Sequence, residues 1–244
     1  MDIRKTWLFQ TPIAHRGLHD ENRPENSLAS FENAVANQYP IELDIRPIDD
    51  GTVVVFHDDR LSRMTDNDGY VCNLTRAELA VQRLANTEEK IPTFEEVLSV
   101  VNGRTPILIE IKNEGKAGLL EKTALEMLKG YPGDFAVQAF NPFALEYFKH
   151  NAPEIMRGQL SCFYEGAALS RFKRSLLKKL KLNRVSAPDF ISYAGANLPN
   201  KYVTRTGLPV LAWTVRSNTE METVLPYCEN IIFEGFIPII NRSE

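Results

Sequence analysis

The sequence has 244 residues, 43% of them apolar and 25% charged, which is the composition of an ordinary globular protein. A chain of this length buries a sizeable core in one large domain or two small ones, which argues against a disordered or disulfide-stapled protein. The 28 Lys and Arg and the 32 Asp and Glu give a formal net charge of −4. This balance lacks the basic excess on which binding to a phosphate backbone depends, so we expect no nucleic-acid partner.

The cysteines and the apolar runs indicate the compartment. Cys72, Cys162 and Cys228 are odd in number, far apart and without Cys-x-x-Cys spacing, a pattern typical of a thiol-reducing compartment and of a protein without structural zinc. The longest uninterrupted apolar runs have four residues, so we expect no membrane span and no stable insertion into a membrane. The apolar run at residues 7–9 is too short for a signal-peptide core, and we expect a cytoplasmic protein. The sequence leaves the oligomeric state open.

Short β-rich runs alternate with segments of helical period along the chain, which is the pattern of a parallel sheet covered by helices. The expected strands cover residues 12–15, 41–46, 107–112, 135–140, 157–160, 184–187, 209–215 and 231–234. Helices with capping signals at their starts are expected over residues 27–38, 93–101 and 217–227. Eight strand-helix units in a chain of 244 residues predict a TIM (β/α)₈ barrel.

One further β-rich run, residues 52–56, follows the strand at 41–46 too closely for a parallel crossover, which needs about a dozen residues or more. Asp50-Gly51 is a strong hairpin signal. We therefore expect the second strand to pass the barrel rim, turn near residues 49–51 and return antiparallel. With the turn centred near residues 50–51, Asp44 and His57 are equidistant from it and are expected side by side at the rim.

Two segments are expected to decorate the barrel without forming a second domain. Residues 58–104 carry turn signals and a Thr75…Glu78 capping box. We expect them to form a small insertion with no core of its own, within a single domain over residues 1–244. Residues 171–184 carry seven Lys and Arg and no acid, with apolar side chains at helical spacing. This stretch is expected to be a barrel helix with a solvated face, and the alternative is a helix lying on a membrane surface.

Acidic side chains are placed at the ends of the predicted strands, where barrel enzymes carry out their chemistry. Residues two apart on a strand share a face, so Glu42 points the same way as Asp44, and Glu110 the same way as Lys112. If these faces line the barrel axis, three carboxylates meet at one rim, where a cation relieves their repulsion. Oxygen ligands with positions left open for water and substrate suit Mg²⁺, Ca²⁺ or Mn²⁺ better than zinc.

Basic side chains and two histidines share these strand ends. Arg16 and Lys112 supply positive charge that a phosphoryl group would meet. His15 and His57 can serve as general acid and general base near neutral pH. Together with the carboxylates, these residues indicate metal-assisted phosphoryl chemistry.

Two further histidines and one tryptophan are also candidates for this site. Trp213 ends an apolar strand and is expected either in the core or as an aromatic wall against the substrate. His19 lies in a polar loop and His150 near the end of a helix, and both are expected to have no catalytic role.

Short motifs follow one another over nearly the whole chain. They are His15-Arg16-Gly17, Pro24-Glu25-Asn26-Ser27, Glu42-Leu43-Asp44, Asp50-Gly51 with His57-Asp58, Ile91-Pro92-Thr93-Phe94-Glu95-Glu96-Val97-Leu98, Glu110-Ile111-Lys112 and Trp213-Thr214. In combination and order they resemble the glycerophosphodiester phosphodiesterase family. The resemblance implies a TIM barrel with a small insertion after the His-Asp motif, and metal-dependent hydrolysis of small-molecule glycerophosphodiesters to an alcohol and glycerol 3-phosphate.

The resemblance also implies roles for the matching residues. It makes Glu42, Asp44 and Glu110 metal ligands, His15 and His57 the acid/base pair, and Arg16 and Lys112 phosphate contacts. It leaves open which histidine is the base, and whether water or a glycerol hydroxyl attacks the phosphorus, the latter through a cyclic phosphate.

The chain departs from the family pattern in its second half. Many members end the last strand with a Thr-Asp pair where this chain has Phe233-Glu234-Gly235, and Ala139 replaces the usual serine. Both positions are expected to lie away from the metal ligands and to affect the choice of substrate more than catalysis.

Two other functions compete with this one. A related barrel enzyme acting on lipid, a lysophospholipase D or a phospholipase C-like enzyme, would be favoured by an exposed apolar patch beside the rim and disfavoured by a closed polar pocket. A catalytically silent barrel that binds a metal or a phosphoester is the alternative from another class. The presence of both histidines argues against it, because a binding protein needs no acid/base pair.

Overall fold

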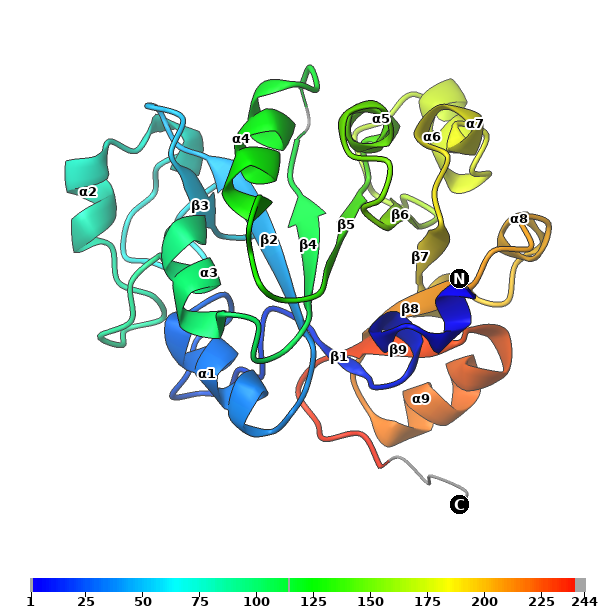
Figure 1. The fold of residues 1–244 in the computed structure, drawn as a ribbon, viewed down its shortest axis with the longest axis horizontal. Helices are drawn as coiled ribbons and strands as arrows, with labels where there is room; N and C mark the ends of the chain where they lie inside the picture. Colours follow the sequence, from blue (N-terminus) through cyan, green and yellow to red (C-terminus); the bar gives the residue numbers. More distant parts are fainter. Residues whose placement is uncertain (1, 114, 240–244) are drawn as a thin grey trace.

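The computed structural model describes residues 2–113 and 115–239 and forms a closed barrel of parallel strands surrounded by helices (Figure 1). The barrel strands are β1 (Ile13–Ala14), β2 (Ile41–Pro47), β4 (Ile107–Ile111), β5 (Phe135–Ala139), β6 (Arg157–Ser161), β7 (Phe190–Ala194), β8 (Val210–Val215) and β9 (Asn230–Phe233). Strand β1 pairs in parallel with both β2 and β9, which closes the sheet. The TIM-barrel prediction is confirmed.

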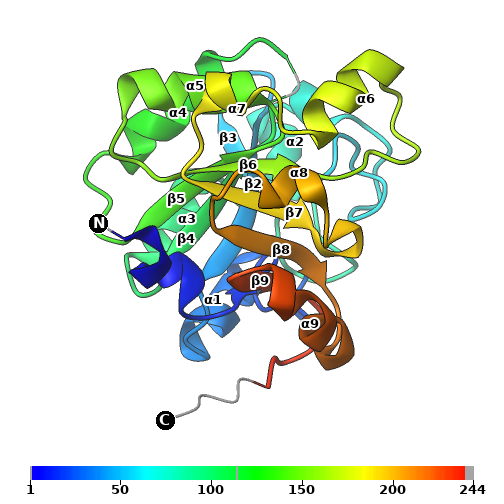
Figure 2. The same cartoon turned by 90° about the vertical axis from the view of Figure 1, so that its right-hand side faces the viewer.

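Helices lie on the outside of the barrel, as Figure 2 shows from a second side. They are α1 (Leu28–Ala36), α2 (Arg76–Val81), α3 (Phe94–Val101), α4 (Leu119–Leu128), α5 (Pro142–Asn151), α6 (Arg171–Lys178), α7 (Asn183–Ser186), α8 (Lys201–Thr204) and α9 (Asn218–Val224). Side-chain caps fix several of their starts. Thr93 and Glu96 form the capping box expected before α3, and Ser27 accepts the Ser30 N–H at the start of α1. Among the described residues, no helix is long and apolar enough to cross a membrane.

The interior of the barrel is apolar at one end and polar at the other. Leu108, Phe190 and Leu211 belong to a buried cluster that Leu8, from the N-terminal segment, covers from below. On β4, Leu108 shares its face with Glu110, which lies further along the strand. The apolar layer is therefore the floor of the polar end.

The expected hairpin is present, with a register one residue away from the predicted one. Strand β3 (Val53–Val55) runs antiparallel to β2, and the Ile48 N–H donates to the Thr52 carbonyl across the turn. The Phe56 N–H donates to the Asp44 carbonyl at 2.9 Å, so Phe56 and not His57 lies opposite Asp44. The prediction was wrong by one residue because the turn is centred on Asp50 rather than after it.

One predicted strand is wrong. Residues 184–186 fall on α7, and the helix ends because Ala187, the next residue, adopts a left-handed conformation (φ 43°). The strand at this place in the barrel is β7, which begins only after Pro188. Its alternation is hard to read from sequence because both faces are buried: Phe190 packs inside the barrel, and Tyr193 packs outside it.

The segment after the hairpin does have an apolar core, contrary to expectation. Leu61, Met64, Val71, Leu74, Leu79, Leu84 and Ile91 form a buried cluster with Ile48, Val54 and Phe56 of the hairpin region. These residues come from loops, from the short 3-10 helix Val71–Asn73 and from α2, so they show no regular period in the sequence. The cluster fixes the segment on the outer face of the hairpin.

Gly158 of β6 provides a test of the barrel packing. A Cβ at this position would overlap the buried ring of Phe190. We expect Gly158→Ala to lower the free energy of unfolding by about 1–3 kcal/mol, because the ring must shift within a close-packed interior. Gly69→Ala is the matched control, since its Cβ would meet only Leu61 Cδ1 at 3.5 Å. Equal losses in the two variants, measured by urea denaturation, would contradict this account.

Candidate active site

Three buried carboxylates meet above the apolar floor of the barrel. Glu42 and Asp44 come from β2, Glu110 comes from β4, and one carboxylate oxygen of each lies within 4.8 Å of the others. Their exposed fractions are 1%, 0% and 7%. Pairing of β2 with β4 places Asp44 beside Glu110. The structure therefore brings together the three acids that the sequence placed on one rim.

Two cations lie among these carboxylates. Lys112 Nζ is 3.1 Å from Asp44 Oδ1 and 2.7 Å from Glu110 Oε1. Arg16 Nε is 3.4 Å from Asp44 Oδ2, and the Arg16 backbone N–H donates to Glu42 Oε2 at 3.1 Å. Both basic residues of the prediction thus contact the acids directly.

The two cations do not neutralise the site fully. Burial, followed by the charges of Asp44 and Glu110, raises the pKa of Glu42 well above its usual range. Burial also raises the pKa of Glu110, although Lys112 opposes it. The pKa of Asp44 is lowered instead, because Lys112, His57 and Arg16 together outweigh the effect of burial. Three carboxylates with a shortage of positive charge are a donor set that fits one hard divalent cation.

Backbone conformation at the end of β1 aims Arg16 at the acids. Arg16 and Gly17 both have left-handed φ values, 56° and 82°. Residue 17 must be glycine, because a Cβ there would overlap Ser30 of α1 as well as being strained at this φ. The Arg16 guanidinium is held from the other side by Glu25, with Nη1 2.6 Å from Oε1.

A chain of ion pairs links Arg16 to His57. Glu25 also accepts from Arg63 Nη2 at 2.6 Å, and Arg63 Nε lies 2.5 Å from Asp58 Oδ2. The other oxygen of Asp58 is 2.5 Å from His57 Nδ1. Arg63 belongs to the segment after the hairpin, so that segment helps to position both Arg16 and His57.

Both histidines of the prediction are held through the same ring nitrogen. His57 Nδ1 contacts Asp58, and His15 Nδ1 lies 2.5 Å from Glu234 Oε2. A carboxylate at Nδ1 favours the tautomer with the proton on that nitrogen, which leaves Nε2 free to accept a proton. His15 Nε2 is 4.0 Å from Glu42 Oε2. Burial lowers the pKa of both histidines, so both are largely neutral at pH 7.

Glu234 was expected to lie away from the metal ligands, and the structure places its carboxylate against His15 Nδ1. The two residues are 219 positions apart in the sequence, so no local sequence pattern predicts their contact. The hydrogen bond from His15 lowers the pKa of Glu234 to about 2. Two further residues were missed: Asn26 donates to Asp44 Oδ2 at 2.9 Å, and Gln138 donates to Glu42 Oε1 at 3.3 Å. The Pro24-Glu25-Asn26-Ser27 motif was the available signal for Asn26 and Glu25.

A cavity of about 500 Å³ opens over the site. It is lined by His15, Arg16, Glu42, His57, Glu110, Lys112, Gln138, Phe140, Leu160, Ala194, Ala196, Trp213, Thr214, Arg216 and Ile232. Trp213 is half-buried and packs edge-on against Phe140, with ring centroids 5.6 Å apart. It therefore forms a wall of the cavity.

The other two histidines do not line this cavity. His19 lies in the loop between β1 and α1, and His150 borders a separate groove along α5. Neither position places an imidazole beside the three carboxylates.

The fold and the site together define a TIM-barrel enzyme of the phosphoric diester hydrolase class. The model of the glycerophosphoryl diester phosphodiesterase family matches residues 15–233, and the chain belongs to this family.

Individual relatives agree with this assignment. The chain is 27% identical over 231 residues to a glycerophosphodiester phosphodiesterase of Caldanaerobacter subterraneus, covering 87% of this chain and 88% of the relative. It is 26% identical over 255 residues to one of Bacillus subtilis, covering 94% and 85%. A solved phosphodiesterase of Oleispira antarctica, in complex with the product sn-glycerol 3-phosphate, is 26% identical, covers 93% of each chain and superposes with a TM-score of 0.77.

The low pKa of Glu234 has a consequence for stability. A carboxyl group whose pKa is lowered by folding stabilises the protein above its unfolded-state pKa, and this contribution is lost as the pH falls through the folded-state pKa. For Glu234 this window runs from 4.5 to about 2. We expect the difference in unfolding free energy between wild type and Glu234→Gln to shrink as the pH falls from about 5 to about 2. Urea denaturation across this range measures it, and a constant difference would contradict the His15 contact.

Proposed function

We propose that this protein is a metal-dependent phosphodiesterase that hydrolyses glycerophosphodiesters to an alcohol and glycerol 3-phosphate. The observation that carries the proposal is the buried cluster of Glu42, Asp44 and Glu110, with His15 and His57 lining the same cavity and each held at Nδ1 by a carboxylate. The Oleispira antarctica relative with bound sn-glycerol 3-phosphate supports the choice of product.

Glu42, Asp44 and Glu110 would hold one divalent cation, Mg²⁺, Ca²⁺ or Mn²⁺. Such a cation, when bound, polarises a phosphoryl oxygen and lowers the pKa of a coordinated hydroxyl or water. Arg16 and Lys112 offset part of the negative charge of the three acids and add positive charge beside the phosphoryl oxygens.

His15 and His57 exchange protons through Nε2. One of them, as the neutral imidazole, accepts the proton of the attacking hydroxyl or water at Nε2. The other must first be protonated at Nε2, as an imidazolium, and then donates that proton to the departing alcohol oxygen. Glu234 and Asp58 orient the two rings through Nδ1 and stabilise the imidazolium that each ring becomes in turn. Each of the two histidines therefore has its own carboxylate partner, Glu234 for His15 and Asp58 for His57.

The far side of the cavity would bind the rest of the substrate. Trp213 and Phe140 offer aromatic surface to the glycerol or to the alcohol group. Arg216 lines the same side and lies 3.5 Å from Glu234 through Nη2.

Hydrolysis of lysophospholipids is a second candidate, favoured by one observation. A groove of about 440 Å³ meets the active-site cavity at Lys112 and is bordered by Tyr70 and Leu119, which are 46% and 72% exposed. An exposed apolar border of this kind can accommodate part of an acyl chain.

We further propose that residues 1–244 act as a single domain in the cytoplasm. The contacts of Arg63 with Glu25 and Asp58 support one functional unit, because they tie the 58–104 insertion to the site. The three cysteines are free thiols, which is typical of a reducing compartment.

Removal of the metal tests the proposal. We expect EDTA to lower turnover about 100-fold or more, because a bound divalent cation supplies several kcal/mol of transition-state stabilisation, and we expect Mg²⁺, Ca²⁺ or Mn²⁺ to restore it. Parallel assays distinguish the two candidate substrate classes. The glycerophosphodiesters are glycerophosphocholine, glycerophosphoethanolamine and glycerophosphoglycerol, and the alternative substrates are lysophospholipids. The proposal would be contradicted if EDTA left the rate of alcohol release unchanged, or if no substrate released an alcohol.

Loss of either histidine should disable the chemistry and leave the metal site intact. We expect His15→Ala and His57→Ala each to lower turnover roughly 10²–10⁴-fold, the range for a lost general acid or base. Binding of Mn²⁺ should persist in both variants. His150→Ala, outside the cavity, is the control and should turn over like the wild type. Near-normal turnover in either site variant would remove that histidine from the mechanism.

A further inference from the structure

Residues 170–208, which carry α6, α7 and α8, form a surface that we call the basic face. They contain nine Lys and Arg and one Asp, whereas the rest of the chain contains 19 Lys and Arg and 31 Asp and Glu. Figure 1 places the three helices together on one side of the barrel. The net charge of −4 is therefore the sum of a strongly basic segment and an acidic remainder of the chain.

The cations of the basic face lack acidic partners within the described part of the chain. None of the nine takes part in an ion pair among residues 2–113 and 115–239. The one acid, Asp189, is occupied by Arg157, whose Nη2 lies 3.5 Å away. Like charges gathered in this way repel one another, and an external anion relieves that repulsion.

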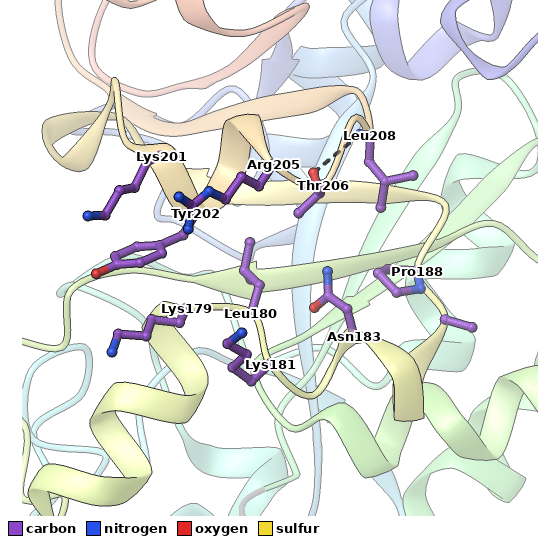
Figure 3. Close-up of a pocket in the computed structure, with 11 residues that line it drawn as sticks. Lys179, Leu180, Lys181, Asn183, Pro188, Lys201, Tyr202, Arg205, Thr206 and Leu208 are labelled. Atoms are coloured by element: carbon purple, nitrogen blue, oxygen red, sulfur yellow. Dashed lines mark hydrogen bonds between the residues drawn. The ribbon is translucent and has the colours of Figure 1, made fainter.

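The basic face is hollowed. A cavity of about 690 Å³ lies between the end of α6, α7 and α8. Four of its lining residues are cationic, none is acidic, and they are Lys179, Lys181, Lys201 and Arg205. Figure 3 shows Lys179 and Lys201 on either side of the Tyr202 ring, with all three side chains reaching the same way. Their Nζ atoms lie 5.9 Å and 5.8 Å from the ring centroid.

An exposed aromatic side chain accompanies the charge. Phe172, on the first turn of α6, is 72% exposed. No residue of α6 is fully buried, and Leu176 and Leu177 are only half-buried. The helix is strongly amphipathic, but the barrel covers its apolar side incompletely.

We propose that the basic face docks this protein on the surface of an anionic phospholipid bilayer. The unpaired cations would meet phosphate and carboxylate headgroups, and the cavity would admit a headgroup between Lys179 and Arg205. Phe172 would enter the boundary between headgroups and acyl chains, which is what favours a bilayer over a nucleic acid. The inference does not depend on the proposed hydrolysis, since neither Phe172 nor any of the nine cations lines the active-site cavity.

Co-sedimentation with vesicles tests the docking. We expect the full chain to bind vesicles of equal parts phosphatidylglycerol and phosphatidylcholine more tightly than vesicles of phosphatidylcholine alone, and to be released by salt. Neutralising four cations together, as Lys179→Gln, Lys181→Gln, Lys201→Gln and Arg205→Gln, should weaken binding to the anionic vesicles roughly 100-fold or more. Phe172→Ser should weaken it as well without altering the charge.

The controls separate docking from folding and from overall charge. A variant with Arg76→Gln, Arg83→Gln, Lys122→Gln and Lys129→Gln makes the same change in charge outside the basic face and should bind the anionic vesicles like the wild type. All three variants should keep the wild-type melting temperature and the wild-type rate of hydrolysis of a soluble substrate. Three results would overturn the proposal: equal binding to neutral and anionic vesicles, equal loss in the control variant, or tighter binding to a duplex oligonucleotide than to anionic vesicles at the same salt.

Discussion

The site depends on the compensation of three buried negative charges. Glu42, Asp44 and Glu110 lie above an apolar floor and cannot turn toward water, so their charge must be balanced inside the barrel. Lys112 and Arg16 supply two positive charges, and Arg16 is shared with Glu25. Burial, and after it repulsion from the neighbouring acids, raises the pKa values of Glu42 and Glu110. A divalent cation would complete the balance, and it would do so at the place where a phosphodiester can reach it.

The same requirement explains the part played by segments remote from the barrel strands. The apolar cluster on the outer face of the hairpin holds the segment that carries Arg63. Arg63 in turn forms ion pairs with Glu25 and Asp58. Through those two carboxylates one folded segment orients both Arg16 and His57. At the other end of the chain, Glu234 does the same for His15. Packing outside the barrel therefore determines how Arg16, His15 and His57 are oriented in the active-site cavity.

Local regularities made much of the site predictable. The two-residue period of a strand places Glu42 with Asp44 and Glu110 with Lys112 whatever the details of the fold. Contacts that join distant segments, such as Glu234 with His15 or Arg63 with Glu25, follow from no local period. The sixth expected strand was misplaced for a different reason: the strand found there, β7, is buried on both faces and shows no clean alternation. His57 reaches the cavity despite the shifted register, since Arg46 Nη2 holds its carbonyl at 2.7 Å where strand pairing has ended.

The central claim is that the buried acids form a site for one divalent cation, and equilibrium dialysis against Mn²⁺ tests it without reference to turnover. The account predicts one ion bound per chain in the wild type, displaced by excess Mg²⁺ or Ca²⁺. It also predicts loss of that ion when Glu42→Gln and Asp44→Asn are combined, with the fold retained. An absence of binding to the wild type, or the same stoichiometry in the double variant, would contradict it.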